Sequence, residues 1–242
     1  MLKMLAIQGS PRPKVSNTEV LLQEFLKGAQ SQGAVTETVY LKEKKINNCV
    51  GCYTCWAKTP GVCVFKDDMP ELLEKVRACD VIVYATPLYN YNMTSLLKVF
   101  QERTIPLLDP HLVKVGNKHR HPTRYETNRT MVLISNCGFP EVEHFDGLRK
   151  IFRIIEGNGS VPLVGEILVP AGEMLRMEPL KGMLKHVFDA VFRAGAEVVK
   201  DGRVSKEAEE IVQKPIFLPE KFIEMANSWW DSKISDNSQG TS

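Results

Sequence analysis

Short hydrophobic segments alternate along this chain with longer segments in which apolar residues recur every three or four positions. The first, residues 2–7, is almost continuous, which is typical of a parallel strand covered on both faces. Strands are predicted over residues 2–7, 34–41, 80–85, 130–135 and 163–169. Helices are predicted between Ser16 and Gly33 and at residues 69–78, 94–103, 144–156, 179–200, 205–213 and 219–230. This alternation predicts an α/β protein with a doubly wound, five-stranded parallel sheet and helices on both faces.

The length of 242 residues suits one such domain with extensions. We expect the domain to span residues 1–204, with a cysteine-rich loop at 49–63 and an insertion at 106–129. Residues 205–242 are expected to form a C-terminal helical extension, with a polar, disordered tail from residue 231.

Composition excludes some function classes. The chain is 43% hydrophobic and 25% charged, with a net charge of only +2, so bulk electrostatics do not indicate nucleic acid. No apolar run approaches the ~20 residues that span a bilayer, and the first strand begins too early for a signal peptide. We therefore expect a cytoplasmic protein without a membrane partner, whose six cysteines are reduced or bind metal.

The turn after the first strand carries the first candidate site. Two prolines and Gly9 break the strand, and Ser16 and Glu19 have capping-box spacing at the start of the next helix. A helix start offers free N–H groups and a positive dipole end, which bind phosphate. The candidate phosphate ligands are Ser10, Arg12, Ser16, Asn17 and Thr18. The alternative is an ordinary capped helix. Both the Walker and the G-x-G-x-x-G signatures are missing, which favours a mononucleotide.

Two further loops follow strands whose carboxyl ends meet the same edge of the sheet, where ligands of such sheets bind. Their aromatic rings and backbone amides suit a planar heteroaromatic ring, although a polar turn with locally packed tyrosines is the alternative. The candidate ring-binding residues are Pro87, Leu88, Tyr89, Asn90 and Tyr91 in one loop and Asn136, Cys137, Gly138 and Phe139 in the other. A phosphate site beside a ring platform is what flavin mononucleotide (FMN) requires.

Four cysteines, Cys49, Cys52, Cys55 and Cys63, follow the pattern C-x2-C-x2-C-x7-C. Such short spacers can aim several thiolates at one metal centre. The alternatives are a [4Fe–4S] cluster, a zinc ion, and free or redox-active thiols. Cys79 is expected in the core, and Cys137 is expected to line the flavin pocket.

These motifs resemble a known family. GSPR-x3-SNT after the first strand, TPLYNYNMTSLLKVFQER after the third and the cysteine loop between them are similar to the flavodoxin-like NAD(P)H-dependent FMN reductases, and most of all to the iron–sulfur flavoproteins. The resemblance covers roughly residues 2–200. It implies a flavodoxin-like fold, tightly bound FMN held by the three loops above, NAD(P)H as co-substrate, and homodimers or homotetramers. It also implies a [4Fe–4S] cluster on the four cysteines, although their last spacer is at the long end of the family's range.

Residues 106–129 form a long basic insertion, which is longer than in minimal members of that family. It is either a solvated loop or a site for the phosphates of NAD(P)H, an acidic substrate or a partner subunit. The pair Trp229–Trp230 is interpreted as a packing or subunit anchor.

The sequence thus predicts an FMN-dependent NAD(P)H oxidoreductase that passes electrons to a quinone, another small acceptor or a bound cluster. Hydride transfer requires no acid or base, so no catalytic side chain is assigned. The rival is an electron-transfer protein that works between redox protein partners, although such carriers tend to be shorter and strongly acidic. A small phosphatase is discounted, because no C-x5-R loop follows the first strand.

Overall fold

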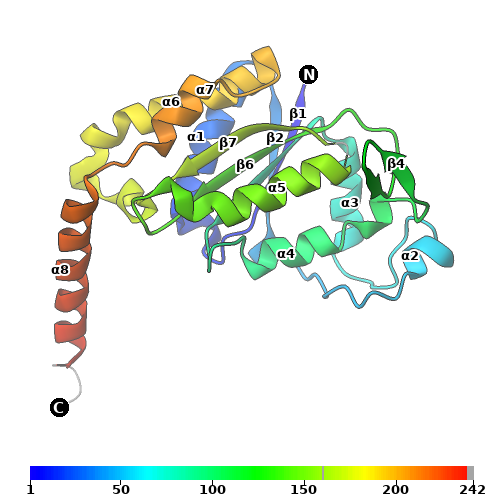
Figure 1. The fold of residues 1–242 in the computed structure, drawn as a ribbon, viewed down its shortest axis with the longest axis horizontal. Helices are drawn as coiled ribbons and strands as arrows, with labels where there is room; N and C mark the ends of the chain where they lie inside the picture. The colour runs from blue at the N-terminus through cyan, green and yellow to red at the C-terminus, as the bar shows by residue number, and fades with distance from the viewer. Residues whose placement is uncertain (160, 239–242) are drawn as a thin grey trace.

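The computed structural model describes residues 1–159 and 161–238. Its centre is a five-stranded parallel sheet in the order β2-β1-β3-β6-β7 (Figure 1). The strands are β1 (Lys3–Gln8), β2 (Val35–Tyr40), β3 (Val81–Pro87), β6 (Thr130–Asn136) and β7 (Leu163–Val169). This order is that of flavodoxin-like sheets, with a switch point between β1 and β3. The predicted fold class is confirmed.

Alternate residues of each strand face opposite layers of helices. Met4 and Ala6 of β1 pack toward α1 (Asn17–Ser31), α6 (Lys181–Asp201) and α7 (Lys206–Gln213). Leu5 and Ile7 of the same strand pack toward α3 (Met69–Ala78), α4 (Ser95–Glu102) and α5 (Asp146–Gly159). The sheet is therefore buried on both faces, which explains the nearly continuous apolar strands.

Helices α1 and α6 approach each other closely at two glycines. A Cβ atom added to Gly28 would lie 1.9 Å from the carbonyl oxygen of Phe192, and one added to Gly195 would lie 1.9 Å from that of Phe25. Any side chain at either position would push the two backbones apart. The pair fixes α6 against the helix whose first turn forms the predicted phosphate site.

Most predicted elements agree with the structure to within two or three residues at each end, and α3 and β7 have the predicted bounds. The 106–129 stretch is not wholly irregular. It contains an antiparallel hairpin of β4 (Val113–Val115) and β5 (Lys118–Arg120), after the 3-10 turn η3 (Ile105–Leu107). A short helix, α2 (Thr54–Ala57), lies inside the cysteine loop. Further 3-10 turns are η1 (Pro13–Val15), η2 (Leu41–Glu43), η4 (Val142–Phe145), η5 (Gly172–Arg176) and η6 (Glu178–Leu180).

The C-terminal extension divides into two unlike parts. Helix α7 packs on α6 and β7 and buries Ala208 and Val212, whereas α8 (Pro219–Ser238) projects away from the body (Figure 1). The expectation of a disordered tail from residue 231 is wrong for residues 231–238, which continue α8; residues 239–242 lie outside the described residues. Trp229 and Trp230 contact each other edge to face and are half exposed. The boundary at residue 204 stays a prediction.

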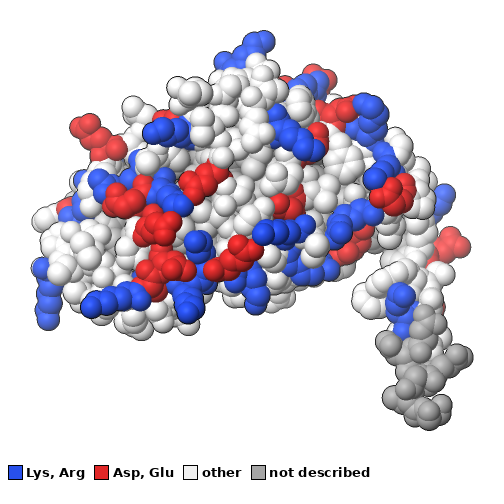
Figure 2. All heavy atoms as spheres, turned by 180° about the vertical axis from the view of Figure 1, so that it is seen from behind, with Lys and Arg blue, Asp and Glu red and all other residues white. Residues whose placement is uncertain are grey.

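Charged side chains of both signs occur on the face seen from behind. Seen from behind, Lys and Arg side chains are interspersed with Asp and Glu (Figure 2), as the net charge of +2 suggests. Lys27 and Glu24 on α1 form an ion pair, and so do Lys185 and Asp189 on α6. Among the described residues, no helix combines the length and the apolar character that crossing a membrane requires.

Candidate functional site

The three predicted loops converge on one pocket at the carboxyl edge of the sheet. The residues that line this pocket are Ser10, Arg12, Ser16, Asn17, Thr18, Pro87, Leu88, Tyr89, Asn136, Cys137, Gly138 and Glu173. All of the predicted phosphate-loop residues are among them. Of the predicted ring-loop and strand-end residues, Asn90, Tyr91 and Phe139 are not. Loops that are separate in the sequence are thus brought together by the parallel register of β1, β3 and β6.

The first turn of α1 forms one wall of the pocket. Ser16 caps the helix, because its Oγ accepts the N–H of Glu19 at 3.1 Å. The N–H groups of Asn17 and Thr18 have no partner within the helix and lie at its positive end. Thr18 Oγ1 donates to Asn136 Oδ1 at 2.6 Å, which ties the helix start to the end of β6. The free backbone N–H groups match the oxygens of a phosphate.

The capping box is only half formed. Glu19 does not return a bond to Ser16; its carboxylate accepts from Gln8 Nε2 at 3.3 Å, Gln23 Nε2 at 2.9 Å and the Tyr40 hydroxyl at 2.8 Å. Burial and the carboxylate of Glu19 raise the pKa of Tyr40 to about 12, so it remains a donor. These hydrogen bonds fix the first turn of α1 to the end of β1 and to β2.

Gln8 is the organising residue that the sequence did not reveal. It is fully buried at the end of β1, and its Oε1 accepts the N–H of Ser10 at 2.5 Å. Its Nε2 donates to Pro13 O at 3.0 Å and to Ser16 Oγ at 3.2 Å. One amide thereby bridges both sides of the turn. A polar residue closing an otherwise apolar strand was the available signal.

The loop after β3 is a tight reverse turn. Tyr89 and Asn92 exchange two backbone hydrogen bonds, of 2.8 and 3.0 Å. Between them, Asn90 and Tyr91 have φ values of 49° and 63°, in the left-handed region that is costly for residues with a side chain. Such strain is concentrated at functional sites, and here it fixes Tyr89 at the pocket wall.

Tyr91 and Phe139 lie beside the pocket in an aromatic stack. His144 lies between them, with ring centroids 5.9 Å from Tyr91 and 4.2 Å from Phe139. Sequence analysis did not single out His144 as a site residue. The stack joins the second and third loops, so their backbones are held at a fixed separation.

Glu173 is an unexpected acidic residue in this pocket. It belongs to η5, after β7, and its Oε2 accepts from Asn17 Nδ2 at 3.3 Å. Gly172 lies against Asn136, where a Cβ would approach the amide nitrogen to 2.6 Å. The loop after β7 therefore closes the pocket from a fourth side. Buried Cys137 also lines it, and burial raises the pKa of its thiol to about 11, so the thiol is neutral.

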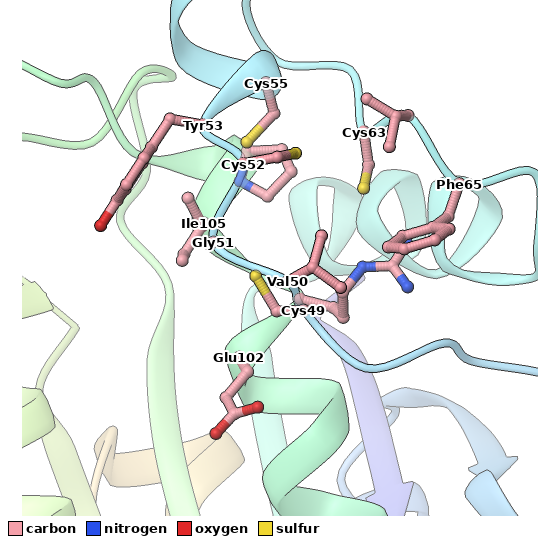
Figure 3. Close-up of a pocket in the computed structure, with 13 residues that line it drawn as sticks. Cys49, Val50, Gly51, Cys52, Tyr53, Cys55, Cys63, Phe65, Glu102 and Ile105 are labelled. Atoms are coloured by element: carbon pink, nitrogen blue, oxygen red, sulfur yellow. The ribbon is translucent and has the colours of Figure 1, made fainter.

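The four motif cysteines line a second cavity of about 60 Å³, together with residues from the end of α4 (Figure 3). None forms a disulfide: Cys55 is buried, Cys52 is exposed, and Cys49 and Cys63 are intermediate. Burial and the neighbouring Cys63, Cys52 and Cys49 raise the pKa of Cys55, whereas hydrogen bonding to Thr54 lowers that of Cys52. Among the described residues, no three His, Cys, Asp or Glu side chains are already gathered as metal ligands.

The donor set nevertheless fits a thiolate-bound centre. Four soft sulfur ligands face one cavity, and binding commonly draws such ligands together. Arg103 lines the same cavity, and its buried Nε–H has no hydrogen-bond partner, so it could donate to a negatively charged ligand there. Cys79 lies in the core instead, where burial raises its pKa to about 11.

A buried ion pair braces this cavity. Arg103 donates to Asp67 from Nη1 at 2.7 Å and from Nη2 at 3.1 Å, and both side chains are almost completely buried. Burial opposes both charges, but their mutual bonds prevail: the pKa of Asp67 is held well below, and that of Arg103 above, the ordinary value. Asp67 also accepts two hydrogen bonds from Asn47. The bonds join the two ends of the cysteine loop.

The ends of this loop are also clamped by two hydrogen bonds between Lys45 and Asp68. Lys45 N donates to Asp68 Oδ2 at 2.7 Å, and Asp68 N donates to Lys45 O at 3.0 Å. The loop therefore leaves and re-enters the fold at neighbouring points.

The 106–129 insertion packs on the cysteine loop. The ring of Trp56 contacts His121 of the insertion at a centroid distance of 4.6 Å, and its Nε1 donates at 3.1 Å to the carbonyl oxygen of Ile105, the residue before the insertion. Gly61 approaches Tyr125 so closely that a Cβ would lie 2.6 Å from the hydroxyl. The insertion supports the second cavity, at the opposite end of α4 from the first.

Helix α4 separates the two cavities. Its cap, Thr94, donates to Gly9 O at 2.6 Å beside the first, whereas Glu102 and Arg103 reach the second. Helix α4 has eight residues and is therefore about 12 Å long, which sets the scale of the separation between the two cavities.

Comparison with known proteins agrees with this architecture. The fold and the polar pocket at the carboxyl edge of the sheet define a flavodoxin-like nucleotide-binding protein. The chain matches the family model of NADPH-dependent FMN reductases over residues 2–135. It belongs to this family, and it is therefore an oxidoreductase with FMN as cofactor and NAD(P)H as electron donor.

The relatives of this chain include iron–sulfur flavoproteins. One, from Archaeoglobus fulgidus, is 30% identical over 199 residues, an alignment that covers 79% of this chain and 83% of the relative. Another, from Methanocaldococcus jannaschii, is 37% identical over 106 residues and covers 44% of this chain and 53% of the relative.

Solved structures share the fold at low sequence identity. An FMN-dependent NADH-azoreductase from Bacillus anthracis in complex with FMN has a TM-score of 0.63 at 16% identity, covering 82% of this chain and all of that one (100%). An NAD(P)H:quinone oxidoreductase from Methanothermobacter marburgensis has a TM-score of 0.59 at 14% identity, covering 81% of this chain and 96% of that one.

Proposed function

We propose that this protein oxidises NAD(P)H through FMN bound in the first cavity and passes the electrons to a quinone or another small acceptor, with a [4Fe–4S] cluster on the four motif cysteines. The observation that carries the proposal is the convergence of three loops, from β1, β3 and β6, on one pocket with a helix start at its wall. The names of the relatives, iron–sulfur flavoproteins and quinone or azo reductases, support it.

In this proposal the first turn of α1 binds the phosphate. Asn17 donates from its backbone N–H and from the amide N–H that does not face Glu173, Thr18 donates from its backbone N–H, and exposed Arg12 adds a positive charge at the entrance. When bound, FMN supplies the acceptor for hydride and returns electrons singly or in pairs. The loop around Tyr89 and the strand end at Gly138 border the place for the ring. Tyr89 is 47% exposed, so this side of the pocket is open to substrates.

Cys49, Cys52, Cys55 and Cys63 would hold the cluster, which supplies one-electron storage when bound. Nearby apolar side chains, such as Phe65 and Ile105, line the same cavity and limit the access of water. The proposed flavin pocket and the sulfur-lined cavity lie at opposite ends of α4.

The first experiment is a visible spectrum of protein purified without oxygen, with iron and sulfide determined on the same sample. Flavin bands with a broad shoulder and about four irons per chain are expected. Flavin without iron would leave an FMN reductase with accessory cysteines. A colourless protein that failed to take up FMN would refute the assignment of the pocket.

Substitutions test each cavity. Asn17→Asp places a carboxylate beside the phosphate and removes a donor, so FMN affinity should fall at least about tenfold; Asn128→Asp, an equal charge change at an exposed position, should leave it unchanged. Equal retention of FMN in both variants would contradict the phosphate assignment.

For the cluster, Cys52→Ala should lower iron and sulfide content, whereas Cys79→Ala, in the core, should not. Full iron in Cys52→Ala would rule the motif out as the ligand set.

The acceptor is tested by anaerobic reduction with NADH or NADPH, followed by a quinone, an azo dye or an oxidised ferredoxin. Rapid bleaching by NAD(P)H and reoxidation by the quinone are expected. Reduction only by reduced ferredoxin would favour the electron-transfer protein.

A further inference from the structure

Arg103 is a buried cation at the wall of the four-cysteine cavity. It follows the last residue of α4 and is 1% exposed, and its backbone N–H bonds to Val99 O and Phe100 O, which anchors it to the helix. Among the described residues that line the cavity, Arg103 is the basic side chain and Glu102 the acidic one. A buried guanidinium needs a specific partner for each of its donors.

Most of those donors are engaged on the side away from the cavity. Nη1 donates to Asn47 O at 2.7 Å and to Asp67 Oδ2 at 2.7 Å, and Nη2 donates to Asp67 Oδ1 at 3.1 Å. Two carboxylate oxygens and one carbonyl oxygen therefore fix the plane of the guanidinium. The ring centroid of Phe65 lies 5.0 Å from Cζ of Arg103, so the ring further limits the movement of the guanidinium.

Two N–H groups are left, one on Nη2 and one on Nε; Nε is buried and has no hydrogen-bond partner. The side chain of Cys63 interacts with the guanidinium, and it is one of the four cysteines of the motif. A buried donor without a partner destabilises the fold by about 1–3 kcal/mol, and an acceptor at this point would remove that cost. A thiolate that ligates a metal is a better acceptor than the neutral thiol, because its sulfur carries negative charge.

Resting on the proposed cluster, we propose that Arg103 is a positioning residue of the four-cysteine centre, held by Asp67 and Asn47 so that its Nε–H donates to the sulfur of Cys63. Asp67 offsets the charge of Arg103, so the cavity receives an oriented N–H dipole rather than a net charge. Uptake of one electron adds one negative charge to the centre. A hydrogen bond to a ligand sulfur favours that reduced state and raises the reduction potential.

The test uses the full-length protein with FMN and cluster, and the variants Arg103→Lys and Arg103→Gln. The readout is the reduction potential of the centre, from titration with a chemical reductant followed by electron paramagnetic resonance, with iron per chain as a check. Both variants should be harder to reduce than the wild type, because neither reproduces the Nε–H. Arg153→Gln is the matched control; Arg153 pairs with Glu166 and Glu156, away from the cavity, and its loss should leave the potential unchanged.

A measurement on the wild-type protein avoids dependence on folding of the variants. With ¹⁵N-labelled arginine, the reduced centre should show a hyperfine coupling to an arginine nitrogen. Absence of that coupling, or an unchanged potential in Arg103→Gln with full iron, would overturn the proposal. A wild-type protein that binds FMN and oxidises NAD(P)H but holds no iron would also overturn it, while leaving the flavin reductase intact.

Discussion

Replacing Asp67 by Asn tests how much the buried ion pair contributes to the fold of the cysteine loop. The Asp67 side chain is 3% exposed and that of Arg103 is 1% exposed. The carboxylate accepts from Nη1 and Nη2 of Arg103, from N and Nδ2 of Asn47, and from the N–H of Met69. Asp67→Asn removes the charge and turns one accepting oxygen into a donor that faces other donors.

The expected cost is large because Arg103 stays buried without its counter-charge. Removing one partner of a buried ion pair lowers the free energy of unfolding by about 3–5 kcal/mol. In a protein of this size, that corresponds to a fall in Tm of roughly 6–20 °C. The matched control is Asp189→Asn: Asp189 pairs with Lys185 at 2.6 Å, with side chains that are 61% and 73% exposed. That exposed pair contributes about 0.5 kcal/mol or less.

The assay is urea unfolding at pH 7, with the same saturating FMN for every variant, so that the contribution of bound cofactor is equal. Asp67→Asn should unfold at a clearly lower urea concentration, and Asp189→Asn at nearly the wild-type one. A loss of less than about 1 kcal/mol in Asp67→Asn would refute the reasoning, since it would mean that the pair is not desolvated.

Two further predictions concern stability. Gly195→Ala should destabilise the protein by about 1–3 kcal/mol in the same assay, because the new Cβ meets the carbonyl of Phe25. The control is Gly182→Ala, which has nothing within 4 Å of its new Cβ and should be neutral or slightly stabilising. Equal stability of the two variants would contradict the close approach of α1 and α6. Burial raises the pKa of Asp67, but its hydrogen bonds outweigh burial and hold the pKa well below the ordinary value. Its contribution is therefore complete above the unfolded pKa of about 3.9 and is lost as the pH falls toward the folded pKa. Unfolding measured from pH 5 downward should show a shallower loss in Asp67→Asn than in the wild type, and identical slopes would refute this origin.

The sheet and the first cavity were predictable because they depend on local patterns. Buried parallel strands appear in the sequence as apolar runs, and every loop that follows one of them reaches the same edge. Ser10, Tyr89 and Gly138 could therefore be assigned to one pocket without knowledge of their contacts. Apolar periodicity also located α3, whose bounds agree with the structure.

Partners that meet only through tertiary packing were not predictable. Glu173 contacts Asn17 across 156 positions of sequence, and Arg103 meets Asp67 across 36. Arg103 appeared only as the end of a helix, and Gln8 only as the residue after an apolar run. The β4–β5 hairpin was missed because strands of three residues are too short to show alternation.

The clamp between Lys45 and Asp68 bears on how such a protein can be redesigned. Because the cysteine loop leaves and rejoins the fold at one point, its middle can change in length or sequence without redirecting β2 or α3. Asn47 and Asp67 at its ends must stay, since they pair with buried Arg103. Redesign of the metal-binding segment can therefore be confined to the residues between these two, while the flavin pocket is left as it is.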